Sequence, residues 1–138
     1  MHWAAFKGRL HIVKYLVEKG AGIEVPPAEA YADGKECGHG LTVLMVAAIN
    51  GHLQIAQFLV DHGAKLEAAD KLGHTALHHA TINGRLAVVR YLVEKGASLG
   101  ARDMDGKTPV DEARSEDHAD HEELRVYLEQ QARKRGHG

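Results

Sequence analysis

The chain has 138 residues, of which 44% are hydrophobic and 26% charged, and its formal net charge is −2. This charge gives no electrostatic footprint for nucleic acid or membrane binding, and the single cysteine, Cys37, excludes an internal disulfide and a thiolate metal cage. No apolar run approaches the roughly 18 residues of a membrane span, and Lys7 and Arg9 interrupt any signal-peptide core. We expect one domain, placed in the cytoplasm or nucleus.

A unit of 33 residues recurs along the chain: Thr42, Thr75 and Thr108 stand at this spacing, and so do Asp70 and Asp103. The first unit matches at an offset of 43, so about ten residues are inserted after it. The predicted domain covers residues 1–138, with units at about 1–25, 37–69, 70–102 and 103–132, an insertion at 26–36 and a tail at 133–138.

Each unit predicts two helices, and the third unit shows the pattern most clearly. Residues 70–74 carry a turn signal, Thr75 is placed as a helix N-cap, and Gly84 ends a first helix. A second helix is expected from about residue 85, because apolar residues recur there at helical spacing up to Gly96. One such pair cannot bury its own apolar face, so neighbouring units must stack. The closest contact between helices is expected at Ala4, Ala47, Ala80 and Ala113, which share one position in the unit.

The segments GLTVLMVAAINGHLQIAQFLVDHGAKLEAAD (40–70) and GHTALHHATINGRLAVVRYLVEKGASLGARD (73–103) resemble ankyrin repeats. The resemblance implies an all-α solenoid of stacked helix-turn-helix units, with β-hairpin-like fingers that line a concave protein-binding surface. Four units in a short chain are similar to the small free-standing members of that family. The motif histidine, which the resemblance implies bonds between neighbouring turns, is kept at His2 and His78 and replaced by Met45 and Asp111.

We expect the chain to bind another protein, as a monomer, and to bind neither nucleic acid nor membrane. The predicted contact residues lie at the ends of the first helices, on the fingers and in the insertion. They are Phe6, Lys7, Ile49, Asn50, Ile82 and Asn83, then His39, Leu41, Lys71, Leu72, His74, Met104, Asp105 and Lys107, and Tyr31. The apolar ones are expected to be exposed; the alternative is that some pack on the neighbouring finger, and that the insertion is only a tolerated surface loop.

Two further sets of residues are interpreted as structural and not as binding or catalytic. The aromatic residues Tyr15, Phe58, Tyr91 and Tyr127 share one position in the second helix and are expected to pack rather than bind. The basic run Arg133–Arg135 is expected to complement the C-terminus of the last helix.

The sequence predicts no enzyme, no cofactor and no metal site. It lacks the motifs of nucleophilic, phosphate-binding, dinucleotide-binding and zinc-dependent catalysis. The pairs His118–His121 and Cys37–His39 lack the spacing of a structural zinc site. A second hypothesis for function stays open, namely a purely structural ankyrin segment of a longer protein whose activity lies elsewhere.

Overall fold

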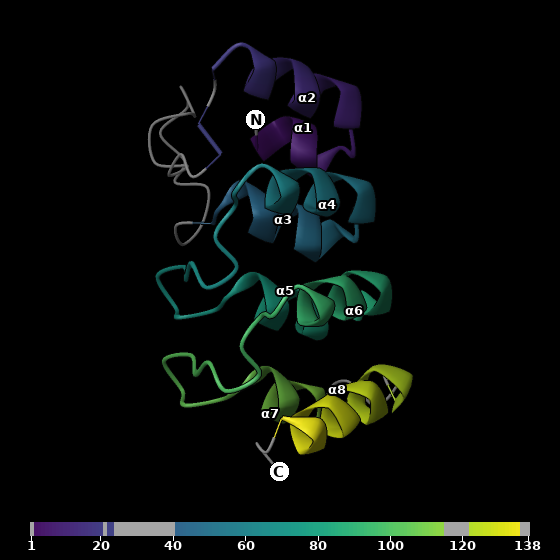
Figure 1. Ribbon diagram of the computed structural model, residues 1–138. Coiled ribbons are helices and arrows are strands. Elements are labelled where there is room, and N and C mark those ends of the chain that lie inside the picture. Colours follow the sequence, from purple (N-terminus) through teal and green to yellow (C-terminus); the bar gives the residue numbers. More distant parts are fainter. Residues whose placement is uncertain (1, 21, 24–40, 115–121, 136–138) are drawn as a thin grey trace.

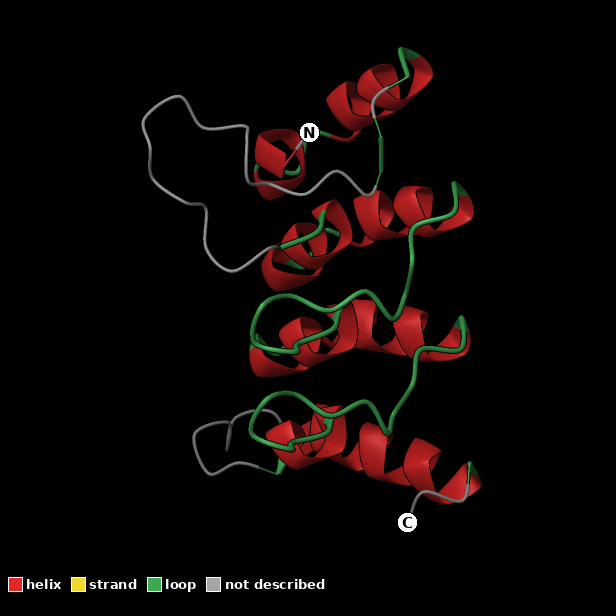
Figure 2. Cartoon of the chain, turned by 90° about the vertical axis from the view of Figure 1, so that its left-hand side faces the viewer, coloured by secondary structure: helices red, strands yellow, loops and turns green. Residues whose placement is uncertain are grey.

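The computed structural model describes residues 2–20, 22–23, 41–114 and 122–135. Within these ranges every regular element is an α-helix, which confirms the predicted all-α class. The helices are α1 (His2–Phe6), α2 (Leu10–Glu18), α3 (Val43–Asn50), α4 (Leu53–Asp61), α5 (Ala76–Ile82), α6 (Leu86–Glu94), α7 (Pro109–Ala113) and α8 (Glu122–Lys134). They form four antiparallel pairs stacked one upon the next, and the loops from α4 to α5 and from α6 to α7 project to one side (Figures 1 and 2).

The three threonines at the 33-residue spacing cap α3, α5 and α7, as predicted. Each hydroxyl accepts a hydrogen bond from the backbone N–H three residues later, and that residue's side chain accepts one from the threonine N–H. The reciprocal acceptors are Met45 Sδ, His78 Nδ1 and Asp111 Oδ2. Three different side chains therefore close the same capping box, which satisfies two otherwise orphaned N–H groups at each helix start.

The interior of the stack is built on small residues where the first helices meet. The shared alanine position is buried throughout, with at most 3% of the residue exposed, at Ala4, Ala47, Ala80 and Ala113. Contacts run from α1 to α3, from α3 to α5 and from α5 to α7. The burial agrees with a position between helices, and a larger side chain there is expected to overpack the stack.

The aromatic row of the second helices packs backwards along the stack. The Tyr91 hydroxyl donates to the Gln57 carbonyl at 3.5 Å, and the Lys14 ammonium lies 5.9 Å from the centre of the Phe58 ring. Tyr127 receives the guanidinium of Arg90 in the same way, at 5.2 Å. Phe58, Tyr91 and Tyr127 thereby contact the preceding second helix, which agrees with the predicted packing role and adds its direction.

Tyr15 departs from this row. It is 57% exposed, so the prediction that it packs like the other three is wrong for this residue. The reason is positional: α2 is the first of the second helices among the described residues, so the ring has no earlier second helix there to pack against.

A second correction concerns the basic run at the end of α8. Arg135 does not serve its own helix; it donates to the carbonyls of Val93 at 2.6 Å and Ala97 at 2.7 Å. These carbonyls lie at and just beyond the C-terminal end of α6, so Arg135 ties α8 to the preceding unit. Arg133 and Lys134 do stand in the last turn of α8.

Candidate protein-interaction surface

Two loops with the same construction project from the stack, finger 70–74 and finger 103–107. In each, an aspartate Oδ1 accepts two backbone N–H groups of its own turn: Leu72 and His74, both at 2.9 Å, for Asp70. Asp103 accepts from Asp105 at 2.9 Å and Lys107 at 3.0 Å. A backbone bond of 3.0 Å closes each turn, from Asp70 to His74 and from Asp103 to Lys107. The recurring aspartate therefore fixes the shape of each finger.

The two fingers are in direct backbone contact. The N–H of Met104 donates to the carbonyl of Leu72 at 3.0 Å. Gly73 has a φ of +80°, and a Cβ there would lie 3.0 Å from the Cα of Asp103, so only glycine allows this approach. The side chains of Leu72 and Met104 remain 42% and 73% exposed. A rigid pair of loops thus presents two apolar side chains to solvent.

The ends of the first helices are tied to the following unit. His52 Nε2 lies 3.0 Å from the carbonyl of Phe6, and Arg85 Nε donates to the carbonyl of Ile49 at 3.0 Å. These side chains cross directly over Gly8 and Gly51, where a Cβ would approach them to 2.8 and 2.9 Å. The repeated glycine thus makes room for a bond between units.

Exposure of the predicted apolar contacts differs from expectation. Phe6 is 52% exposed, in agreement with the prediction, but Leu41, Ile49 and Ile82 are half-buried. The prediction of free exposure is therefore wrong for these three, and Leu41 packs against the hydrophobic core. Tyr31 and His39 lie outside the described residues.

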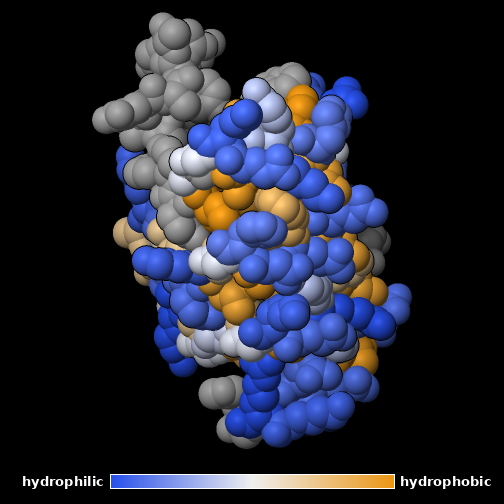
Figure 3. Space-filling model, turned by 45° about the horizontal axis from the view of Figure 1, so that its top comes forward, coloured by the Kyte–Doolittle hydropathy of each residue, from blue (hydrophilic) through white to orange (hydrophobic). Residues whose placement is uncertain are grey.

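The predicted polar contacts fall into two groups. Asn50 and Asn83 donate their side-chain amides to carbonyls of their own helices, at 2.9 and 2.8 Å, and so partly cap α3 and α5. The other members keep exposed side chains around the apolar positions: Lys7, Lys71, Asp105 and Lys107. Figure 3 shows apolar side chains emerging in patches between hydrophilic ones on the face that it draws.

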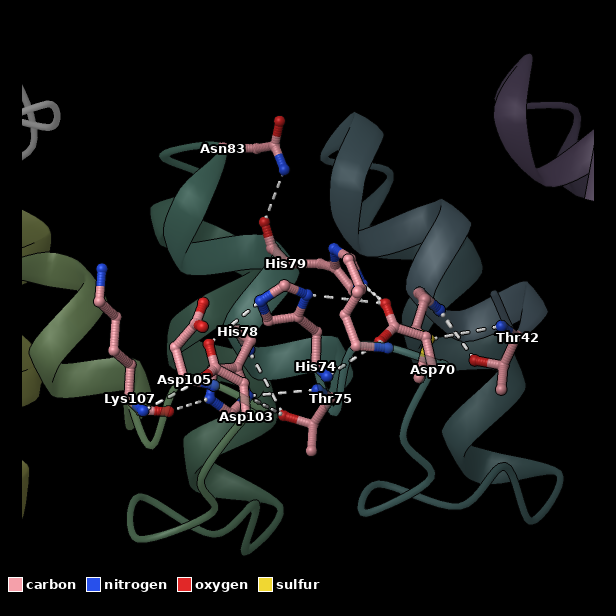
Figure 4. Close-up of polar contacts among 12 residues, drawn as sticks. Thr42, Asp70, His74, Thr75, His78, His79, Asn83, Asp103, Asp105 and Lys107 are labelled. Carbon is pink, nitrogen blue, oxygen red and sulfur yellow. Dashed lines mark hydrogen bonds and ion pairs between the residues drawn. The ribbon is translucent and has the colours of Figure 1, made fainter. Parts of the chain in front are cut away.

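Three histidines, His74, His78 and His79, lie where finger 70–74 joins α5, which we call the finger base. His78 is fully buried, and its Nε2 lies 2.9 Å from the carbonyl of Lys107, which confirms the bond between neighbouring turns that the resemblance implied. His74, predicted as a contact residue, is half-buried and lies between two buried carboxylates (Figure 4). Its Nδ1 is 3.8 Å from Asp70 Oδ2 and its Nε2 is 3.2 Å from Asp103 Oδ2. His79 Nε2 completes the group at 2.8 Å from Asp70 Oδ2.

Two members of this group, His79 and Asp103, have shifted pKa values. Burial lowers the pKa of His79 below its ordinary value and outweighs the opposing effect of Asp70. Burial acts to raise the pKa of Asp103, but the N–H donors of Lys107 and Asp105 outweigh it, so that pKa lies below its ordinary value.

A hollow at the last unit offers a different kind of surface, lined by Leu99, Val110 and Ala132 with three arginines around them. Two of these arginines already have acceptors: Arg102 donates to the Gly106 carbonyl at 2.9 Å, and Arg114 pairs with Glu129 at 3.0 Å. The Arg114 hydrogen bond lowers the pKa of Glu129. Because the protein itself occupies these donors, the hollow is a weaker candidate than the fingers.

Sequence reasoning missed the group at the finger base. It weighed Cys37, His39, His118 and His121 as metal ligands, and these lie outside the described residues. The signal for Asp70, His74 and His79 was an Asp, a His and a second His at spacings of four and five residues, running from a turn into a helix. The part played by Asp103 depends on the stacking of the next unit.

Comparison with protein families gives a match to the model of ankyrin repeats, in three copies, over residues 1–103. A comparison with curated proteins gave no match. None of the described helices is long and apolar enough to cross a membrane. The matched part covers most of the chain and includes α1 to α6 with finger 70–74, and α7 and α8 stack on it as a further helix pair. The chain therefore belongs to the ankyrin-repeat family.

Proposed function

We propose that this chain binds a partner protein through the finger surface, which we define as fingers 70–74 and 103–107 together with the ends of α1, α3 and α5. Ankyrin repeats are in general modules for protein–protein interaction rather than enzymes. The observation that carries the proposal is the exposure of Leu72 and Met104 on two loops whose backbones are hydrogen-bonded to each other. Apolar side chains held in place before binding are the pattern of interface anchors.

The polar surround fits the same proposal. Lys71, Asp105 and Lys107 flank the two apolar tips and are exposed. An apolar centre with a polar rim is the usual anatomy of a protein interface. Because the aspartates and His78 already fix the fingers, binding would order little additional backbone, which lowers the entropic cost of association.

The half-buried Ile49 and Ile82 would form the floor of a groove beside the fingers, with Phe6 at its first end. The segment 26–36, with Tyr31, stays a predicted contact from the sequence and lies outside the described residues. We further propose that the chain acts in the cytoplasm or nucleus, because its single cysteine excludes an internal disulfide, and that it acts as a monomer.

The test is affinity purification from the source organism with three forms of the full chain. The Leu72→Ala/Met104→Ala double variant removes both finger tips. Tyr15→Ala is the matched control, because it removes a comparably exposed apolar side chain from the second-helix side. We expect a protein recovered with the wild type and with Tyr15→Ala, and depleted with the double variant.

A purely structural ankyrin segment is the competing function. It predicts that all three forms recover the same proteins or none. Recovery that depends on Tyr15 and not on the finger tips would place the binding surface on the second helices instead, and would contradict the proposal.

A further inference from the structure

We propose that Asp70, His74 and His79 form a zinc-binding site at the base of finger 70–74, with Asp103 holding His74 in position. Asp70 Oδ2, one nitrogen of His74 and one of His79 all lie within 4.8 Å of one another. The three side chains converge from one turn and the helix that follows it (Figure 4). One carboxylate and two imidazoles are a donor set that Zn²⁺ uses in sites with one open position.

The distances are compatible with a single ion between the three side chains. Zinc bonds of about 2.0–2.1 Å to nitrogen and oxygen place tetrahedral ligand atoms roughly 3.3 Å apart. Asp70 Oδ2 lies 2.8 Å from His79 Nε2 and 3.8 Å from His74 Nδ1, so one distance must lengthen and the other shorten by about 0.5 Å. The His74 and His79 rings stand edge to face with centres 5.2 Å apart.

An independent observation comes from Asp103. Its side chain is only 1% exposed, and Oδ2 is a buried oxygen without a hydrogen-bond partner among the described residues, although His74 Nε2 lies 3.2 Å away. A small rotation of the imidazole would let Nε2–H donate to that oxygen. Metal-bound histidines are typically oriented by such a carboxylate on the far ring nitrogen.

With this orientation of His74, the contact between its Nδ1 and Asp70 Oδ2 becomes unfavourable. If Nε2 carries the proton, Nδ1 presents a lone pair to the carboxylate of Asp70, and two acceptors face each other across 3.8 Å. A cation between them removes the conflict, and zinc would also take the place of the proton between His79 and Asp70. The low pKa of His79 is compatible with this, because a neutral imidazole binds metal without first losing a proton.

Zinc at this site would hold finger 70–74, which carries Leu72, against α5. Its ligands join the turn at Asp70 and His74 to α5 at His79, and they contact the next finger through Asp103. Zinc binding therefore stabilises the folded chain by mass action. This inference does not depend on the finger surface being the binding site for a protein partner.

The experiment is a titration of the full chain with Zn²⁺ alone, by calorimetry and by thermal melting, at pH 7. His79→Gln removes a ligand but retains an amide donor for Asp70. Asp103→Asn replaces the carboxylate oxygen that faces His74 by an amide N–H₂ and keeps an oxygen for the backbone N–H groups of the finger. His11→Gln is the matched control, because His11 is an exposed histidine on α2. We expect one site in the wild type and in His11→Gln, affinity lowered by about 10–100-fold in Asp103→Asn, and at least as large a loss in His79→Gln.

Equal zinc affinity in all four forms, or no binding to the wild type, would overturn the proposal. If a variant fails to fold, the ring-nitrogen NMR spectrum of the wild type decides. Zinc must shift the His74 and His79 resonances at one equivalent. A His74 ring that carries both protons and does not respond to zinc would show that a proton, and not a metal, occupies the space between the carboxylates.

Discussion

The finger surface and the second-helix aromatic row both carry large, mainly apolar side chains, but these differ in how far they are buried. Phe58, Tyr91 and Tyr127 are half-buried because each contacts the helix of the unit before it. Leu72 and Met104 stay exposed although their backbones are hydrogen-bonded to each other. A repeated position in the unit is therefore buried only where the neighbouring unit supplies a contact. Apolar side chains that stay exposed on hydrogen-bonded loops are the ones available to a partner.

The largest effect is expected beneath the fingers. His78→Ala should destabilise the fold by about 2–4 kcal/mol, because it leaves a cavity and deprives the Lys107 carbonyl and the Thr75 N–H of their buried partner. Chemical unfolding measures this directly. His62→Ala is the control, since His62 is exposed and bonds only within its own helix, to Phe58. An equal loss in both variants would mean that the finger base is not a distinct source of rigidity.

The aromatic row itself can be tested by comparing its two kinds of member. Tyr91→Ala should cost about 1–2 kcal/mol, because a half-buried ring and its bond to Gln57 are lost. Tyr15→Ala should stay within about 0.5 kcal/mol, because that ring is exposed. Thermal melting of the two variants provides the measurement, and equal costs would contradict the proposed direction of packing.

Acid should lower the free energy of unfolding in two stages, first through His79 and then through Asp103. The folded-state pKa of His79 lies below 6.5 and that of Asp103 below 3.8, so the unfolded chain takes up each proton first. The stability from His79 is present above pH 6.5 and is lost as the pH falls below it, and the loss from Asp103 follows below pH 3.8.

Urea unfolding across this range, with a chelator present, should show the decline. His79→Gln is expected to remove the first stage and keep the second. A free energy of unfolding that rises between pH 6.5 and 5 in the wild type, or a first stage that persists in the variant, would be inconsistent with these pKa directions.

The smallest stability effects are expected at the finger tips. Leu72→Ala and Met104→Ala should each change the free energy of unfolding by less than about 0.5 kcal/mol, because both side chains are largely solvated. Differential scanning calorimetry is sufficient to measure this. A loss above 1 kcal/mol for either would show that the tips are part of the fold and not a surface kept for binding.

Features set within one unit could be predicted from the sequence. The threonine caps follow from local spacing, and the structure has them as predicted. Features set between units could not be predicted in the same way. The exposure of Tyr15 depends on which helix precedes it, and Arg135 reaches carbonyls 38 and 42 residues earlier in the chain.

The candidate surface shows the same division. The exposure of Phe6, Leu72 and Met104 followed from their place in the unit. The partial burial of Ile49 and Ile82 did not, because it depends on how closely successive units approach. The position of His74 between two carboxylates requires the next finger, which contributes Asp103 from 29 residues further along the chain.

The most direct test of the finger surface is to measure affinity and stability together, with a recovered partner and two variants. For Leu72→Ala/Met104→Ala, we predict a dissociation constant raised at least about tenfold, equivalent to about 1.4 kcal/mol, and an unchanged melting midpoint. For Tyr91→Ala, we predict a lowered melting midpoint and, at temperatures below that midpoint, an unchanged dissociation constant. The reverse pattern, in which the finger tips control stability and Tyr91 controls affinity, would contradict the account.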